Sequence, residues 1–293
     1  MTSEVNAHEK RRSLRQRLQG KGLLRFPGAY SPLIARLIEL HEFDGVYMSG
    51  SVTAASLLLP DLGMTTMTEV ADNAREISFA TRLPTIVDID TGFGPPTTLA
   101  RAVSLLEAAG ICGMQIEDQV LPKRSGHLSG HVLCSILEMQ LRIRSAVRAR
   151  RDPDLLVVAR TDAAPYEGIE RAIERAKAYQ DCGADVIFAD ALSGLGDCEK
   201  IARALQAPIL VNMAEFGKSP LLTASELESA GARIVIYPGT TLRLALNAVD
   251  QGLAQLRDDG TQKNLLVKMM PRERFKKLVS DADYVAFDNA VGK

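Results

Sequence analysis

The sequence has few cysteines, no excess of charge of either sign and no long apolar run, and each absence excludes a class of protein. The 293 residues include four cysteines, too few for a disulfide scaffold and in no CxxC pair. The 35 basic and 36 acidic residues argue against a protein that binds nucleic acid or an anionic membrane. No apolar run approaches the roughly 18 residues of a membrane-spanning helix. Residues 1–20 lack the apolar core of a signal peptide. We therefore expect a cytoplasmic protein.

Short apolar runs alternate with amphipathic stretches along the chain. Eight runs rich in Val, Ile and Leu, without strict alternation, predict strands buried on both faces of a parallel sheet. They are residues 22–26, 44–48, 85–89, 113–117, 155–159, 185–189, 209–212 and 233–237. Apolar residues at spacings of three and four predict helices between these strands. They are residues 31–42, 66–81, 97–109, 135–151, 167–182, 196–205 and 223–230.

Eight βα units in about 230 residues predict an α/β fold of the (β/α)₈ TIM-barrel type. A doubly wound open sheet is the alternative, but no GxGxxG motif follows the first predicted strand and the sequence contains no Walker motif. We expect a single barrel domain over residues 1–293. It would carry an N-terminal helix at about residues 8–20 and a C-terminal helical tail at about residues 261–293.

Acidic residues follow two neighbouring predicted strands, at the end where the loops of such a barrel build the active site. Asp88 and Asp90 are two apart on one predicted strand, so we expect both side chains on the same face, and Glu117 ends the next strand. Carboxylates crowded in this way raise each other's pKa, and a divalent cation relieves the repulsion. Oxygen ligands favour Mg²⁺, with Mn²⁺ as an alternative. The other interpretation is that the acids cap helices or pair with basic residues.

The segment from residue 118 to residue 133 shows no periodicity, and a loop of about 16 residues in a compact barrel is typically functional, often as a lid. It contains two cations, a hydroxyl, a flexible glycine and a titratable histidine, which could together bind a di- or tricarboxylate and carry a proton. These residues are Lys123, Arg124, Ser125, Gly126 and His127. A solvated basic loop is the alternative interpretation.

Two further side chains at predicted strand ends have two interpretations each. The planar guanidinium of Arg160 suits a substrate carboxylate, but it could equally pair with Asp162 or Glu117. Tyr47 is either a donor to an oxyanion or a core aromatic residue with one polar end.

Six sequence stretches together carry a resemblance to a known family, although any one alone would be weak. They are YMSGSVTAASLLLPDLG (47–63), VDIDTGFG (87–94), IEDQVLPKRSGH (116–127), ARTDA (159–163), NMAEFG (212–217) and GTQK (260–263). From about residue 14 to about residue 288, the chain resembles the isocitrate lyase and phosphoenolpyruvate mutase superfamily, and within it the 2-methylisocitrate lyases.

This resemblance implies a Mg²⁺-dependent carbon–carbon lyase that cleaves 2-methylisocitrate to pyruvate and succinate, a step of the methylcitrate cycle in propionate breakdown. It also implies a barrel whose last helix is exchanged between the subunits of a homotetramer. Three activities of the superfamily are alternatives: dimethylmalate lyase, oxaloacetate hydrolase and phosphonate mutase. A non-catalytic barrel that binds dicarboxylates is an alternative of another class.

The resemblance also assigns roles to individual residues. The implied metal ligands are Asp88 directly and, through water, Asp61, Asp90 and Glu117. The residues implied to contact the pyruvyl portion are Tyr47, Ser49, Gly50 and Ser51, with Arg160 orienting its carboxylate. The gating loop would include Lys123, Arg124, Gly126 and His127. The remaining residues of the substrate pocket would be Asp190, Asn212 and Glu215.

The chain departs from the family pattern at three places. Residue 125 is Ser where the lyases carry the Cys that protonates the nascent carbanion, and an alkyl hydroxyl is a far weaker acid than a thiol. Loss of such an acid typically costs about 10²–10⁴-fold in rate. Ser125 is thus an engineered substitution, a natural one with another acid or substrate, or the mark of a silent homologue. Asp190 replaces a common Glu, and Gly239-Thr240 replaces a more usual Leu-Ser.

Overall fold

The structure is a computed structural model that describes residues 6–124 and 130–292. Each of the eight predicted strands is present, within two residues of its expected bounds. They are β1 (Leu24–Pro27), β2 (Val46–Met48), β3 (Thr85–Asp88), β4 (Gly113–Glu117), β5 (Leu156–Thr161), β6 (Val186–Ala189), β7 (Ile209–Asn212) and β8 (Ala232–Tyr237). The apolar runs therefore located the strands well.

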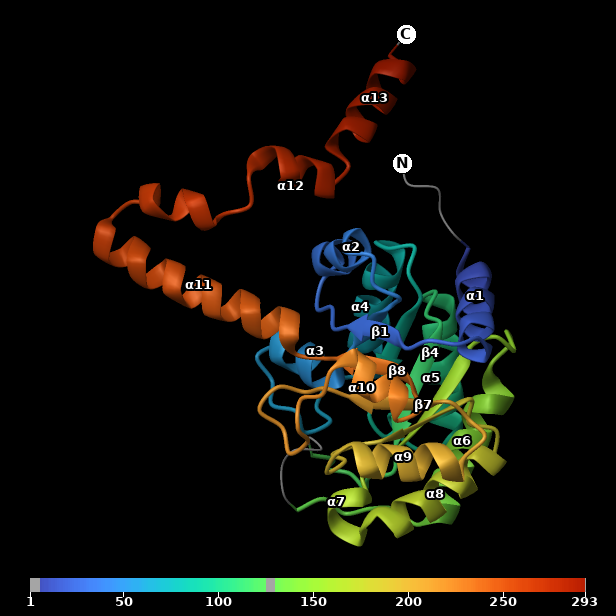
Figure 1. The fold of residues 1–293 in the computed structure, drawn as a ribbon. Coiled ribbons are helices and arrows are strands. Elements are labelled where there is room, and N and C mark those ends of the chain that lie inside the picture. The colour runs from blue at the N-terminus through green and yellow to red at the C-terminus, as the bar shows by residue number, and fades with distance from the viewer. Residues whose placement is uncertain (1–5, 125–129, 293) are drawn as a thin grey trace. The chain divides into compact units, whose positions relative to one another are not determined.

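The strands form one parallel sheet in the order β1-β8-β7-β6-β5-β4-β3-β2. Figure 1 labels the neighbouring strands β7 and β8 of this sheet. A bridge between Gly28 and Tyr47 joins the ends of this order, and the backbone N–H of Ala29 donates to the carbonyl of Tyr47 over 2.9 Å. The sheet is therefore a nearly closed barrel, which confirms the predicted fold class and excludes the doubly wound alternative.

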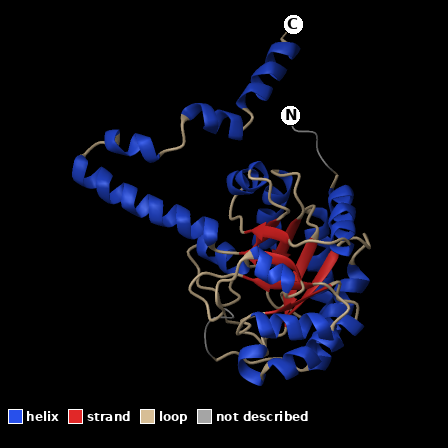
Figure 2. Cartoon of the chain, viewed as in Figure 1, coloured by secondary structure: helices blue, strands red, loops and turns tan. Residues whose placement is uncertain are grey.

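Helices surround this sheet (Figure 2). The seven helices predicted between the strands are α2 (Pro32–Leu40), α4 (Met67–Phe79), α5 (Pro96–Ala108), α6 (Ile136–Ala149), α8 (Ile169–Asp181), α9 (Leu195–Ala204) and α10 (Ala224–Ser229). Two short helices have no counterpart in the sequence prediction, α3 (Gly50–Ser56) and α7 (Ala164–Glu167). Both follow the carboxyl end of a strand, so they belong to the loops that build the site.

Alternation along the strands separates the barrel interior from its outer layer. Tyr47, Val158 and Phe188 belong to an interior cluster, whereas the strand residues between them pack towards the helices. The interior cluster also contains Leu14 and Leu18 of α1 (Ala7–Gln19), together with residues at the starts of several strands. The helix α1 therefore covers the amino end of the barrel, and the carboxyl end carries the polar residues.

From Thr241 onward the chain forms a second compact unit. It consists of most of α11 (Thr240–Asp259), the 3₁₀-helix η1 (Lys263–Lys268), α12 (Arg272–Leu278) and α13 (Asp281–Val291). The predicted exchange of a helix between subunits and the single domain over residues 1–293 stay predictions. Within the described ranges 6–124 and 130–292, no helix is both long and apolar enough to cross a membrane.

Candidate active site

Asp88 ends β3, and its carboxylate is held by the backbone. The N–H of Gly50 donates to Oδ2 over 3.2 Å, and the N–H of Asp90 donates to Oδ1 over 3.1 Å. A Cβ on Gly50 would lie 2.9 Å from Oδ1 of Asp90 and 3.1 Å from Oδ2 of Asp88. Glycine at position 50 therefore allows two carboxylates to approach the start of α3.

Asp88 and Asp90 do not lie on the same strand, so the prediction that strand alternation places them on one face is wrong. The strand β3 ends at Asp88, and Asp90 has a φ of 51°, in the left-handed region. Asp90 therefore lies in a turn after the strand, and the direction of its side chain is not set by strand alternation. The two carboxylates are nevertheless neighbours, because this turn brings Asp90 beside Gly50 as well.

Lys123 lies among these acids rather than in a solvated loop. Its side chain is 3% exposed, and its Nζ lies 2.5 Å from Oδ1 of Asp61 and 2.6 Å from Oδ1 of Asp90. Burial opposes the charge, but the surrounding carboxylates, Glu117 first, raise the pKa of Lys123 above its ordinary value. The side chain therefore stays charged and joins two of the predicted site residues, Asp61 and Asp90.

Glu117, the last residue of β4, is buried in this site and one of its carboxylate oxygens has no hydrogen-bond partner among the described residues. It is 1% exposed, and this oxygen is Oε1. Its Oε2 lies 3.6 Å from Nε of Arg160. Burial raises the pKa of Glu117 well above its usual range, although Lys123 and Arg160 oppose the shift. Burial and the charge of Asp90 likewise raise the pKa of Asp88 to about 6.

An orphaned buried carboxylate oxygen beside acids of raised pKa fits a hard divalent cation. No three of Asp61, Asp88, Asp90 and Glu117 bring ligand oxygens within 4.8 Å of one another. A cation held here would therefore have few direct protein ligands, and Mg²⁺ is an ion that usually keeps several waters.

One group of three potential ligands does meet in the described part of the chain, but at the other end of the barrel. It consists of His8, Asp152 and Asp154, and the two acids precede β5. Asp152 pairs with Arg11 and Asp154 pairs with Arg15. These partners already compensate the two carboxylates, so this group is no part of the candidate site.

Arg160 pairs with carboxylates, as one of its two interpretations from the sequence predicts, and this pairing leaves the other interpretation open. Its Nη2 lies 2.8 Å from Oδ1 of Asp162 and 2.6 Å from Oδ2 of Asp190. Asn212 donates from Nδ2 to the second oxygen of Asp190 over 3.1 Å. The Nη1 atom of Arg160 has no hydrogen-bond partner in the described residues, so it could still donate to a substrate carboxylate. The buried Oδ1 of Asn212 likewise has no partner there.

Tyr47 points into the barrel, where its hydroxyl donates to Oε1 of Gln115 over 2.7 Å. Burial and the charge of Asp88 raise the pKa of Tyr47 well above its usual value. The phenol therefore stays protonated, with its proton directed at Gln115. Beside it, the hydroxyls of Ser49 and Ser51 lie 2.9 Å apart.

Three predicted residues of the loop, Ser125, Gly126 and His127, lie outside the described residues. The structure brings the predicted pocket residues Asp190 and Asn212 together with Arg160. The remaining predicted pocket residue, Glu215, forms a hydrogen bond with the hydroxyl of Thr240, which ties it to the first residue of α11.

Sequence reasoning missed the two residues that follow Glu117. The side chain of Gln119 bonds to the main chain of Arg124 and to Asp162. Asp118 accepts hydrogen bonds from the hydroxyls of Thr161 and Tyr179, both over 2.7 Å. The available signal was the run of three polar residues from Glu117 to Gln119 at the end of an apolar strand. The sequence analysis gave a role only to the first of them.

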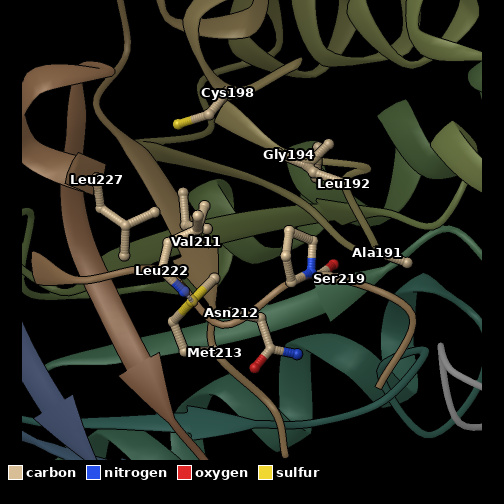
Figure 3. A pocket seen from close by; sticks show the side chains of 12 residues that line it. Ala191, Leu192, Gly194, Cys198, Val211, Asn212, Met213, Ser219, Leu222 and Leu227 are labelled. Atoms are coloured by element: carbon tan, nitrogen blue, oxygen red, sulfur yellow. Dashed lines mark hydrogen bonds between the residues drawn. The ribbon is translucent and has the colours of Figure 1, made fainter. Parts of the chain in front are cut away.

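A small cavity lies behind β6 and β7, and Figure 3 shows that Asn212 borders it together with Cys198, Met213 and Leu222. Its volume is about 10 Å³, enough for at most one water molecule. Most of its lining is apolar. It is therefore a packing defect of the outer layer and no substrate pocket.

Comparison with known proteins places the chain in a family. The family described as phosphoenolpyruvate phosphomutase matches residues 14–257. The chain is 49% identical to a Corynebacterium glutamicum protein named "Probable 2-methylisocitrate lyase 2", over 99% of this chain and 94% of that protein. It is 44% identical to the 2-methylisocitrate lyase of Aeropyrum pernix, over 96% of this chain and 90% of that protein.

Solved structures extend the comparison. A 2,3-dimethylmalate lyase of the PEP mutase/isocitrate lyase superfamily is 34% identical with a TM-score of 0.90, over 99% of this chain and 97% of that one. An oxaloacetate acetylhydrolase is 36% identical with a TM-score of 0.91, over 98% and 99%. A phosphonopyruvate hydrolase in complex with oxalate and Mg²⁺ is 28% identical with a TM-score of 0.88, over 97% and 99%. The chain therefore belongs to the phosphoenolpyruvate phosphomutase family, within the PEP mutase/isocitrate lyase superfamily.

Proposed function

We propose that this protein is a Mg²⁺-dependent carbon–carbon lyase that cleaves 2-methylisocitrate to pyruvate and succinate. The observation that carries the proposal is the buried group of Asp88, Asp90 and Glu117 at one mouth of the barrel, facing Arg160. Full-length relatives named as 2-methylisocitrate lyases support the choice of substrate.

In this proposal the acids hold the cation and Arg160 holds the substrate. Asp88 would bind Mg²⁺ directly, and Asp61, Asp90 and Glu117 would hold its waters. When bound, the ion would polarise the oxygen that becomes the pyruvate carbonyl. Arg160, fixed by Asp162 and Asp190, would direct its Nη1 to the carboxylate of the pyruvyl portion.

The remaining predicted residues would divide the substrate between them. Ser49, Gly50 and Ser51, at the start of α3, would contact the pyruvyl portion. The unpartnered Oδ1 of Asn212, together with Glu215, would line the space for the succinyl portion. The hydroxyl of Tyr47 donates its proton in a hydrogen bond to Oε1 of Gln115, so its oxygen could accept a hydrogen bond from the substrate hydroxyl but would not donate one.

Transfer of a proton to the succinate carbanion is the slow step that this proposal predicts. Lys123, Arg124 and His127 would belong with residue 125 to the gating loop, and a serine hydroxyl at position 125 is a poor acid. We therefore propose that the chain binds its substrate and turns it over slowly.

The test is formation of pyruvate and succinate from 2-methylisocitrate by the Ser125→Cys variant, with Mg²⁺ and with a chelator. Parallel assays with 2,3-dimethylmalate and oxaloacetate address two of the three alternative superfamily activities, because solved structures of enzymes with these activities resemble this chain. Preferential cleavage of 2-methylisocitrate supports the proposal. Preferential turnover of another substrate reassigns the activity, and binding of dicarboxylates without any turnover indicates a binding protein.

We also propose that the protein works as a cytoplasmic homotetramer. Support comes from α11, a 20-residue helix in which no residue is buried although it carries Leu244, Val249 and Leu253. A second copy of the chain would cover this apolar surface. Sedimentation analysis tests the oligomeric state, and a monomer at micromolar concentration would contradict it.

A further inference from the structure

The side chain of Gln119 uses both of its amide hydrogens and its oxygen inside the protein. The backbone N–H of Arg124 can only donate, so the atom that it meets over 2.8 Å is Oε1 of Gln119. Nε2 then donates to the carbonyl of Arg124 over 2.9 Å and to Oδ2 of Asp162 over 2.8 Å. Gln119 is 1% exposed. Its orientation is therefore fixed by three hydrogen bonds.

Asp162 continues this chain of hydrogen bonds to the active site. Its other oxygen, Oδ1, accepts from Nε of Arg160 over 3.1 Å and from Nη2 over 2.8 Å. Its backbone N–H donates to Oδ1 of Asp118 over 3.0 Å, which fixes the main chain at Asp162. One buried amide thus connects the main chain at Arg124 with the guanidinium of Arg160, through Asp162 alone.

The base of the loop has other supports that do not use this amide. Gln119 and Leu133 form an antiparallel bridge, and the N–H of Val120 donates to the carbonyl of Val132 over 2.8 Å. The N–H of Cys134 donates to the carbonyl of Asp118 over 2.8 Å. The stem therefore remains paired without the side chain of Gln119, whose own contacts go instead to Arg124 and Asp162.

We propose that Gln119 is a positioning residue that couples the placement of Arg124 to that of the Arg160 guanidinium. This inference rests on the proposed function, because that function assigns Arg160 to substrate binding and Arg124 to the gating loop. The coupling requires a neutral amide, since a carboxylate at position 119 would lose both donated hydrogen bonds and lie against the charge of Asp162. Loss of the amide should therefore weaken carboxylate binding at Arg160, although Gln119 itself touches no substrate.

The variant Gln119→Met keeps the length of the side chain and removes its hydrogen bonds. Its matched control is Gln180→Met, because Oε1 of Gln180 also accepts two backbone N–H groups, from Gln206 and Ala207, both over 2.8 Å. The probe is oxalate with Mg²⁺, measured by titration calorimetry. We expect the Kd for oxalate to rise about tenfold in Gln119→Met and to stay within about twofold in the control.

A double-mutant cycle separates coupling from general damage. In an Arg160→Lys background, the effect of Gln119→Met on the oxalate Kd should shrink to less than about twofold. Gln119→Glu alone should weaken oxalate binding. The double variant Gln119→Glu with Asp162→Asn should bind oxalate at least about threefold more tightly than Gln119→Glu alone. The reason is that the amide introduced at position 162 can donate to the carboxylate introduced at position 119, while its oxygen still accepts from Arg160. This rescue also carries the test if Gln119→Met fails to fold.

Two results would overturn the inference. One is an unchanged oxalate Kd in Gln119→Met while only the melting temperature falls, as in the control. The other is an equal rise in the oxalate Kd on Gln119→Met in the parent and in the Arg160→Lys background. Oxalate binding requires no turnover, so failure of the coupling is distinguishable from failure of the proposed lyase activity. When Gln119→Met is added to an active Ser125→Cys chain, KM should rise by a larger factor than kcat falls, which tests the positioning role independently of oxalate binding.

Discussion

The ammonium nitrogen of Lys123 lies 2.6 Å from Oδ1 of Asp90, and both side chains are buried. This ion pair links the loop after β4 to the turn after β3. It also means that the acids of the site are partly compensated by a protein cation, while Glu117 keeps an orphaned oxygen. The stability and metal affinity of the site both depend on this balance of charge.

Removal of the ammonium group should destabilise the metal-free protein. In Lys123→Met, Asp61 and Asp90 lose a shared cation, and breaking a buried pair costs on the order of 3 kcal/mol. Thermal unfolding in a chelator measures the loss, and added Mg²⁺ should recover part of it. The control is Lys200→Met, since Lys200 lies 4.0 Å from Glu170 in an exposed pair. Equal melting temperatures for Lys123→Met and the control would contradict the prediction.

Neutralising Asp88 should stabilise the metal-free protein while abolishing metal binding. The pKa of Asp88 is raised to about 6, above the value near 3.9 of an unfolded chain, so the folded state binds this proton more tightly. The charged form therefore opposes folding above pH 6, and this penalty disappears as the pH falls through 6 towards 4.

Asp88→Asn should thus be more stable than the parent at pH 7.5, by about 1–3 kcal/mol in a chelator, and equally stable near pH 4. Added Mg²⁺ should raise the melting temperature of the parent only. Chemical denaturation at both pH values makes the comparison. If Asp88→Asn were less stable than the parent at pH 7.5, the charged carboxylate of Asp88 would not oppose folding, and the prediction would be wrong.

A methyl group at position 50 should impair the metal site without unfolding the barrel. The new Cβ of Gly50→Ala would lie 2.9 Å from Oδ1 of Asp90, so the carboxylates must move. We expect Mg²⁺ affinity, measured by calorimetry, to fall at least about tenfold. The control is Gly252→Ala in α11, where a Cβ meets nothing within 4 Å and should stabilise the helix by about 0.5–1 kcal/mol. Unchanged affinity in Gly50→Ala would contradict the proposed ligand set.

The strands were predictable because a buried parallel strand leaves an uninterrupted apolar run, as in residues 113–117. The helix α3 was not, since Gly50–Ser56 consists of small residues with little of the apolar spacing that marks a helix. The barrel order then follows from eight successive βα units, which also explains why residues after different strands meet at one mouth.

Pairings between distant residues were beyond sequence reasoning. Gln119 and Asp162 are 43 positions apart, and nothing local to either residue indicates the other. The position of Asp90 depends on a left-handed turn that the sequence pattern did not mark, whereas the choice of partner for Arg160 depends on the packing of β5 against β6. Residue types therefore predicted which groups gather, and the fold decides how they pair.

The proposed disabled proton donor is tested most directly by the ratio of kcat for Ser125→Cys to kcat for the parent chain. Both are measured on 2-methylisocitrate with saturating Mg²⁺, by coupled detection of pyruvate. A thiol at this position should raise turnover by about 10²–10⁴-fold, with a much smaller change in KM. A ratio near one with an active parent would show that residue 125 is not the acid, and the absence of pyruvate from both proteins would contradict the lyase assignment itself.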